Sequence, residues 1–183
     1  MRRPGGTTSR SGFSLIEIAV VMILLVIAIG GLSSAVVSSI RLSRTNEESA
    51  IADDAARRMI AELRTVGFLD IFASFNADPG DDPGGAGSAP GPNFVVVGLT
   101  PQNDDADGLV GEIRFPTAPL GPGVALNEDS QDSNLGMPRD LNGDGDSTDL
   151  VQTNYLVLPV SVRIQWTGSA GRSFVELRTV ITE

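Results

Sequence analysis

The sequence predicts an α+β fold in which a long N-terminal α-helix, membrane-spanning in its first half, packs on a small antiparallel β-sheet. Three observations predict this fold. The run from Ile18 to Ile40 carries no charge and is long enough to cross the ~30 Å hydrocarbon core of a bilayer as a helix. An apolar stripe at helical spacing follows this run, and the end of the chain alternates apolar and polar side chains as a β-hairpin does.

The N-terminal segment 1–12 is short and basic. Arg2, Arg3 and Arg10 precede the apolar run, so the positive-inside rule predicts a single-pass protein whose N-terminus lies in the cytoplasm and whose remaining part lies across the membrane. Within the apolar region the one charged side chain is Glu17. A carboxylate near the start of a membrane span is costly, which makes Glu17 a candidate functional residue.

Glu17 lies four residues after Phe13, on the same face of a helix. A cut between Gly12 and Phe13 would give Phe13 a free amine one turn from the Glu17 carboxylate. The amine and the carboxylate could then compensate each other's charge, within one subunit or between neighbouring subunits.

The segment Gly12-Phe13-Ser14-Leu15-Ile16-Glu17 behind a basic leader resembles the prepilin-type cleavage and methylation segment of type IV pilins and type II secretion pseudopilins. The resemblance implies that a prepilin peptidase cuts after Gly12 and methylates Phe13, and that Glu17 guides helix assembly into a filament. It implies three kinds of partner: the peptidase, other pilin or pseudopilin subunits, and the inner-membrane assembly machinery. It also implies that the chain is a single-pass protein of the inner membrane, with its C-terminal part in the periplasm or outside the cell, before it enters a pilus or pseudopilus. The resemblance is closest to minor pilins and minor pseudopilins that end in a short Val-x-Val-x-Trp strand, a turn and a strand, because this chain ends in the similar strand Val160–Trp166, a turn and a second strand.

Three other interpretations of the apolar segment stay open. An ordinary signal anchor would need no glutamate at position 17. A removed secretory signal peptide could use the small residues Ser33 and Ala35 as its cleavage site. A buried helix of a soluble protein would need no basic leader. The chain also departs from many pilins, since no proline occurs between Pro4 and Pro79.

The helix is expected to continue to about Val66, with Gly67 as its stop. Apolar residues recur there at spacings of three and four, which indicates one apolar face. We expect this face to pack on the chain's own domain, with a docking face for a foreign partner as the alternative. The residues of the stripe are Ile51, Ala55, Met59, Leu63 and Val66.

The remaining residues predict a β-rich head. Phe68 to Phe75 is expected to be a structured connector, and residues 78–92 a Gly/Pro/Asp linker without helix or strand. Strands are expected at Phe94–Leu99 and Leu109–Phe115, an irregular acidic stretch at 116–138, and a hairpin formed by Val160–Trp166 and Val175–Ile181. The predicted organisation is a leader at 1–12, a transmembrane and assembly helix at 13–40, its amphipathic continuation at 41–67, and an extracytoplasmic head at 68–183.

The composition excludes several functions. The net charge is −10, and the acidic residues crowd into the head, which disfavours nucleic acid and anionic lipid headgroups as partners. The chain has no cysteine and no histidine, so disulfides, thiolate chemistry and imidazole catalysis are excluded. No nucleophile motif or phosphate-binding loop occurs, and we predict that the protein is not an enzyme.

One loop has the spacing of a calcium site. Oxygen-bearing side chains occupy positions 1, 3, 5 and 7 with glycine at 6, a pattern that gathers the oxygens Ca²⁺ requires. The loop departs from an EF-hand because Val151 stands where the closing glutamate belongs, and Asp149 could supply that carboxylate instead. The alternative is a solvated acidic turn. Calcium binding would favour a second function, a membrane-anchored extracytoplasmic calcium-dependent binding domain that does not polymerise. The candidate ligands are Asp140, Asn142, Asp144, Asp146 and Asp149.

Overall fold

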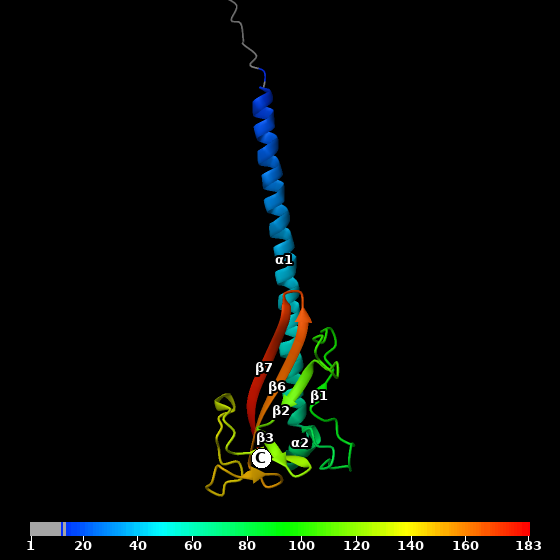
Figure 1. The fold of residues 1–183 in the computed structure, drawn as a ribbon, viewed down its shortest axis with the longest axis vertical. Coiled ribbons are helices and arrows are strands. Elements are labelled where there is room, and N and C mark those ends of the chain that lie inside the picture. The colour runs from blue at the N-terminus through cyan, green and yellow to red at the C-terminus, as the bar shows by residue number, and fades with distance from the viewer. Residues whose placement is uncertain (1–11, 13) are drawn as a thin grey trace, which may run out of the picture. The chain divides into compact units, whose positions relative to one another are not determined.

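The computed structural model describes residue 12 and residues 14–183. The basic leader before Gly12, and Phe13 itself, therefore lie outside the described residues. The chain divides into two units, one that ends at Ser43 and one from Arg44 to Glu183. A single helix, α1, runs through both units from Leu15 to Leu63 (Figure 1).

Helix α1 confirms the long N-terminal helix. Its first turn forms at Ser14, whose carbonyl oxygen accepts hydrogen bonds from the Glu17 and Ile18 N–H groups at 3.0 and 3.2 Å. Gly30 and Gly31 lie within it without interrupting it, although each glycine costs about 1 kcal/mol relative to alanine. The side chains of residues 14–43 are exposed.

The second part of α1 packs on the head, as the apolar stripe predicted. Ala52, Ala56 and Leu63 are completely buried, and Ile51, Ala55 and Met59 pack beside them half-buried. Alanine is small, so the helix backbone can lie close to its neighbours where Ala52 and Ala56 face them. The helix ends at Leu63, three residues before the expected end.

Gly67 precedes a second, short helix, α2, at Phe68–Phe75. The expected connector is therefore helical. Ile71, Phe72 and Phe75 are buried, and the Tyr155 hydroxyl fixes the start of α2. That hydroxyl lies 2.9 Å from both the Phe68 and Leu69 carbonyl oxygens and accepts a hydrogen bond from the Phe72 N–H at 3.4 Å.

The main sheet is antiparallel with the strand order β1-β2-β6-β7. The long C-terminal hairpin confirms the predicted alternation, and twelve consecutive residue pairs join its strands without a bulge. Its turn is only Ser169-Ala170, shorter than expected, because pairing continues to Gly168 and Gly171. Trp166 is 1% exposed and belongs to the core. The strands are β1 Asn93–Phe94, β2 Gly111–Arg114, β6 Val157–Gly168 and β7 Gly171–Thr182.

Two expectations for the head are wrong. The strand expected at Phe94–Leu99 is reduced to β1, because the chain turns at Gly98 with φ +95° and leaves Val97 87% exposed. The stretch 116–138 is not irregular. It contains β3 Thr117–Leu120, β4 Gly123–Asn127 and a 3₁₀ turn at Ser133–Leu135.

The strands β3 and β4 form a second antiparallel sheet with β5, Leu150–Val151, in the order β3-β4-β5. Pro119 obscured this sheet in the sequence, but β3 is an edge strand, where a missing N–H is tolerated. Ala125 and Leu126 are completely buried and give the sheet its core. The linker 78–92 contains no helix or strand, as expected.

Candidate functional site

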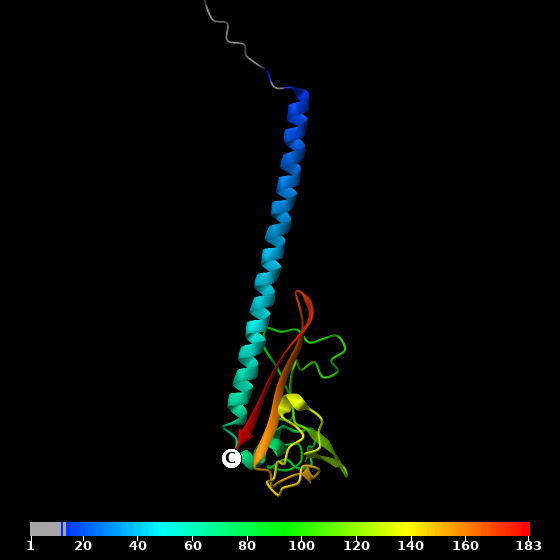
Figure 2. The same cartoon turned by 90° about the vertical axis from the view of Figure 1, so that its left-hand side faces the viewer.

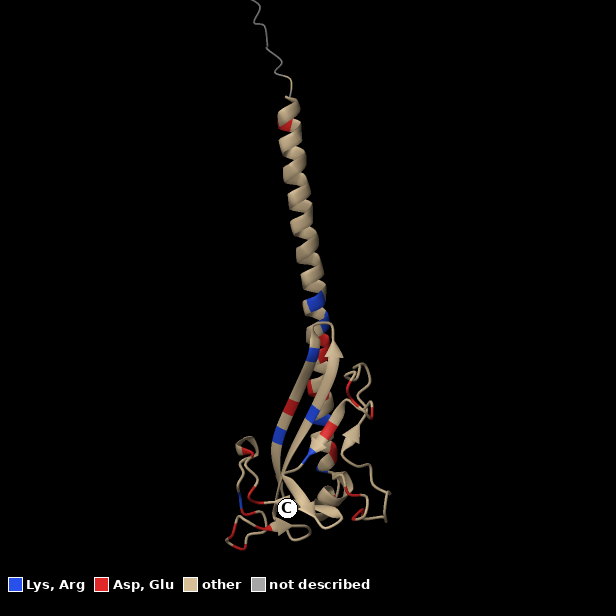
Figure 3. Cartoon of the chain, in the orientation of Figure 1, with Lys and Arg blue, Asp and Glu red and all other residues tan. Residues whose placement is uncertain are grey.

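The first candidate site is the start of α1. Glu17 lies in the first turn and is exposed, and every side chain from Leu15 to Ile40 is also exposed. Figure 3 shows a single acidic position near the start of this part of the helix, which agrees with the sequence, where Glu17 is the one charged residue from Ser14 to Ile40. Among the described residues, α1 is the one helix that is both long enough and apolar enough to cross a membrane. The most apolar stretch of this helix is not buried by the rest of the chain.

The predicted processing residues, Gly12 and Phe13, fall at the edge of the described chain. Gly12 is exposed and lies outside any helix or strand, and a side chain added there would meet no atom within 4 Å. Phe13, whose amine would face Glu17 after cleavage, lies outside the described residues. No ion pair within residues 14–183 involves Glu17.

The second candidate site is the acidic loop at 140–149, where all five predicted ligands lie together. Asp140 accepts hydrogen bonds from the N–H groups of Gly143 at 2.5 Å and Gly145 at 2.9 Å. Both glycines have positive φ, 81° and 93°, which the tight turn requires. The side chain of Asp140 therefore closes the loop on its own backbone.

The next ligands continue this pattern along the loop. The Asn142 side-chain oxygen accepts from the Asp144 N–H at 2.9 Å, and Asp144 accepts from the Asp146 N–H at the same distance. Asp146 accepts from the Thr148 N–H and hydroxyl at 2.9 and 2.8 Å. These carboxylate oxygens are engaged with N–H groups, so a cation would have to share or displace them.

The charges of the loop influence one another. Backbone hydrogen bonds from Gly145 and Gly143 lower the pKa of Asp140, and hydrogen bonds from Thr148 lower the pKa of Asp146. Desolvation, followed by repulsion from Asp144 and Asp146, raises the pKa of Asp149. The carboxylates thus lie close enough to repel. Within the part of the chain that the structure describes, no group of three or more acidic side chains is arranged to hold a metal ion.

Sequence reasoning missed Glu128, which lies beneath this loop and is completely buried. One carboxylate oxygen, Oε1, accepts hydrogen bonds from the N–H groups of Leu141 at 2.6 Å and Asn142 at 3.3 Å. The backbone N–H of Glu128 donates to the Asp149 carbonyl at 3.1 Å, and its own carbonyl accepts from the Arg139 N–H at 3.1 Å. Glu128 therefore holds both ends of the acidic loop.

The second carboxylate oxygen of Glu128, Oε2, has no hydrogen-bond partner among the described residues. No sequence signal marked this residue, because Asn127-Glu128-Asp129-Ser130 has the composition of a solvated turn. Its burial depends on backbone donors thirteen residues further along the chain.

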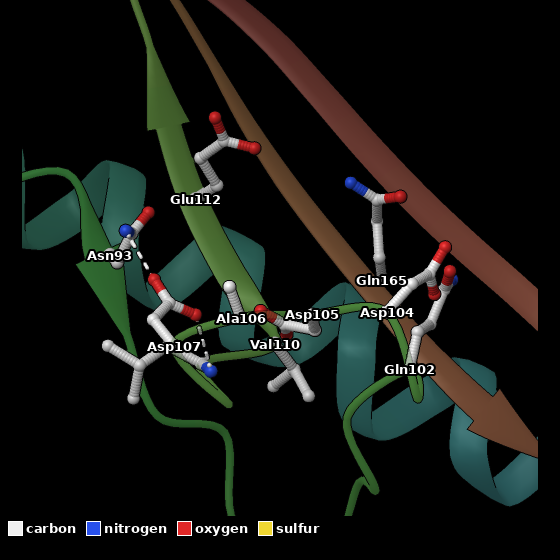
Figure 4. Close-up of a pocket in the computed structure, with 10 residues that line it drawn as sticks. Asn93, Gln102, Asp104, Asp105, Ala106, Asp107, Val110, Glu112 and Gln165 are labelled. Carbon is white, nitrogen blue, oxygen red and sulfur yellow. Dashed lines mark hydrogen bonds between the residues drawn. The ribbon is translucent and has the colours of Figure 1, made fainter.

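The third candidate site is an acidic hollow of about 410 Å³ beside β2 (Figure 4). Asp107 accepts hydrogen bonds from the Asn93 amide at 2.6 Å and the Leu109 N–H at 2.9 Å, and its hydrogen bond to Asp105 raises the pKa of Asp105. Asp104 forms an exposed ion pair with Arg172 at 3.0 Å. Asp104 and Asp107 are exposed and Asp105 is half-buried, and the hydrogen bonds of Asp107 order the turn that leads into β2.

We compared the chain with protein-family models, with curated proteins and with solved structures, and none of the three comparisons gave a match.

Proposed function

We propose that the chain is a minor pilin or pseudopilin, a structural subunit without enzymatic activity. In this proposal prepilin peptidase cleaves it between Gly12 and Phe13, and methylates Phe13. The subunit is held in the inner membrane by α1, with its N-terminus in the cytoplasm and its head outside. It is then built into a type IV pilus or a type II secretion pseudopilus.

One observation carries the proposal. Helix α1 presents apolar side chains on all sides from Ile18 to Ile40, with a single carboxylate, Glu17, in its first turn. The head uses only the later part of the helix, around Ala52, Ala56 and Leu63. An exposed apolar helix needs lipid or other helices around it, and a carboxylate at its start needs a charge partner.

The first test concerns processing. Mass spectrometry of the mature protein should find N-methylated phenylalanine, Phe13, at its N-terminus. The variant Gly12→Val should accumulate as an uncut membrane precursor, whereas the leader variant Gly6→Val should be processed normally. A mature chain that begins elsewhere, for example at Val36, would contradict the proposal.

The second test concerns assembly. Glu17→Ala should insert into the membrane at least as well as the wild type, because a carboxylate is costly in lipid. It should nevertheless be missing from sheared filaments, since the charge partner acts only during assembly. Glu47→Ala, an exposed acid of the same helix beyond Ser43, is the matched control. Wild-type amounts of Glu17→Ala in filaments would rule out this role.

The second candidate function is a membrane-anchored, calcium-dependent binding domain. Two observations favour it. Desolvation, followed by repulsion from the neighbouring carboxylates of the loop, raises the pKa of Asp149, and Glu128 is a buried acid at the base of that loop whose Oε2 has no hydrogen-bond partner among the described residues. In this case Asp140, Asn142, Asp144, Asp146 and Asp149 would supply the oxygen ligands.

Thermal unfolding of the full chain in detergent, with calcium and with chelator, tests calcium binding. A ligand at a hundredfold excess over its Kd stabilises the folded state by about 2.7 kcal/mol, which corresponds to a rise in Tm of roughly 5–10 °C. Asp144→Ala should abolish the shift, whereas Asp129→Ala, outside the loop, should retain it. Magnesium serves as a further control because it tolerates irregular oxygen cages poorly. Identical melting curves would reduce the loop to a solvated turn.

A further inference from the structure

Strand β7 is the edge of the main sheet, and its outer side is unpaired. The hairpin closes on a two-residue turn, so Gly168 and Gly171 form a hydrogen-bonded pair and every second residue of β7 from Gly171 bonds to β6. Consistent with this register, Gln165 and Thr167 of β6 donate to the opposite side, toward Val110 and Thr100.

The alternate residues of β7 therefore direct their N–H and C=O groups outward. Within residues 14–183 no backbone hydrogen bond uses these groups. Figure 2 shows β7 beside β6 in the hairpin, and the 3₁₀ turn Ser133–Leu135 lies near β7 without pairing with it. The outward residues are Arg172, Phe174, Glu176, Arg178, Val180 and Thr182.

Proteins usually protect such an edge with a proline, a bulge or a short strand. Strand β7 has none of these, since its pairing runs unbroken from Gly171 to Thr182. Its outward row also exposes apolar side chains, with Phe174 61% and Val180 37% exposed. The charged side chains of the row form two ion pairs, Arg172 with Asp104 and Arg178 with Glu176. The first pair is exposed and therefore weak, whereas the Glu176 side chain of the second pair is only 13% exposed.

A hollow of about 390 Å³ lies at the C-terminal end of this edge. Val66 lines it from the turn between α1 and α2, Phe68 and Ile71 line it from α2, and Val180 lines it from β7. Arg64, Thr182 and Glu183 add polar groups to the lining, so the hollow can accept a side chain whose apolar part enters beside the edge. Strand addition typically combines a ladder of backbone hydrogen bonds with such a pocket.

We propose that β7 receives an extended segment of a partner protein as an added antiparallel strand. Residues directly opposite one another on such a pair should complement each other. From its N-terminus, the segment carries an apolar residue opposite Val180, an acidic one opposite Arg178, a basic one opposite Glu176 and an apolar one opposite Phe174. A residue at the beginning of the segment fills the hollow.

The sequence of β7 satisfies this pattern itself. Pairing two copies about Leu177 sets Phe174 against Val180 and Glu176 against Arg178, each twice. Two whole chains in this arrangement would have α1 helices that run in opposite directions, which two proteins anchored in one membrane cannot adopt. The choice of a partner segment over a second copy thus rests on the proposed membrane anchoring, whereas the site itself does not.

The self-complementary sequence supplies a probe. A fluorescein-labelled synthetic peptide with the sequence of residues 172–182 is titrated with the full chain in detergent, and fluorescence anisotropy reports binding. We expect saturable binding. Glu176→Pro removes an outward N–H that the fold does not use, so it should abolish binding while the near-ultraviolet circular dichroism of Trp166 stays unchanged.

Charge reversal tests the register. Glu176→Arg should weaken peptide binding about fivefold, because arginine then faces the peptide residue that corresponds to Arg178. A peptide with glutamate at that position should recover the affinity. The control Glu112→Arg, on the same sheet face but two strands from the edge, should bind the original peptide normally.

Three results would overturn the proposal. They are an absence of saturable peptide binding, binding that Glu176→Pro leaves unchanged, and a loss in Glu176→Arg that the reversed peptide does not recover. Analytical ultracentrifugation could also show that the full chain is dimeric and that Glu176→Arg is monomeric. That result would mean that β7 binds a second copy of the chain and not a segment of a partner protein. Filament assembly with Glu17 intact is measured separately, so failure here leaves the proposed function standing.

Discussion

Replacement of Glu128 should reveal how the acidic loop is held to the head. Its carboxylate oxygen Oε1 accepts from the N–H groups of Leu141 and Asn142, and the carboxylate is completely buried. Glu128→Ala leaves the Leu141 N–H buried without an acceptor, and water can reach the Asn142 N–H only in part. An unsatisfied buried donor costs about 1–3 kcal/mol, and the cavity left by the side chain adds to this.

The expected total is a loss of about 2–4 kcal/mol in the free energy of unfolding, or a fall in Tm of roughly 5–15 °C. Glu128→Gln separates the acceptor from the charge. The glutamine oxygen can still accept from Leu141, and the substitution removes a buried charge whose second oxygen has no described partner. We therefore expect Glu128→Gln to be within about 1 kcal/mol of the wild type, or more stable.

Thermal unfolding of the full chain in detergent measures these differences. The near-ultraviolet circular dichroism of Trp166 and Tyr155, the one tryptophan and the one tyrosine of the sequence, reports on the head and not on the exposed part of α1. Asp129→Ala, the exposed neighbour, is the control and should melt with the wild type. The reasoning fails if Glu128→Ala melts with the wild type, or if Glu128→Gln falls as far as Glu128→Ala.

Two further predictions concern the packing of the head. Burial raises the pKa of Tyr155 to about 12, above the value near 10 of an unfolded tyrosine. The contribution of the protonated Tyr155 side chain to the free energy of unfolding is therefore fully present below pH 10 and is lost as the pH rises toward 12. In urea unfolding between pH 9 and 11.5, the free energy of unfolding of the wild type should fall by about 1.4 kcal/mol per pH unit above pH 10, and Tyr155→Phe should not show this fall. Equal slopes of the free energy against pH in the two proteins would contradict this prediction. Gly168→Ala should destabilise by about 1–3 kcal/mol, because the new methyl group overlaps the Glu48 carboxylate and lies 2.9 Å from the Trp166 ring nitrogen. Adding Glu48→Ala should recover part of this loss in melting experiments, and a strictly additive double variant would refute the steric explanation.

The sequence predicted most reliably where one periodic pattern continued over many residues. The helix from Leu15 to Leu63 and the hairpin of β6 and β7 each repeat their apolar spacing often enough for one period to dominate. The register of the stripe was less certain, because Ala52 and Ala56 proved more deeply buried than Ile51 and Ala55. Burial on a helix depends on how closely the neighbouring sheet approaches, which spacing alone does not determine.

The short strands were not predicted, because the segments that pair with them, and not their own residues, determine whether they form. Val95 to Leu99 is apolar enough for a strand, but the main sheet gives β1 only two partners on β2. Conversely, β3 contains Pro119 and still pairs with β4, since only one side of an edge strand needs its N–H groups. The burial of Glu128 has the same origin, because the donors that satisfy it lie in a distant part of the sequence.

The two parts of α1 obey different physical requirements, and this difference bears on Glu17. From Arg44 onward the helix has one buried face, which its own head covers, so polar side chains such as Glu47 remain in water at little cost. From Ile18 to Ile40 the helix carries exposed apolar side chains on every face. Under the proposed function, lipid or other helices cover this part, and Glu17 is costly in lipid but can meet an amine in a filament. Under the proposed function, this single carboxylate would therefore favour the assembled subunit over the subunit waiting in the membrane, and removing it should abolish that preference while leaving the head folded.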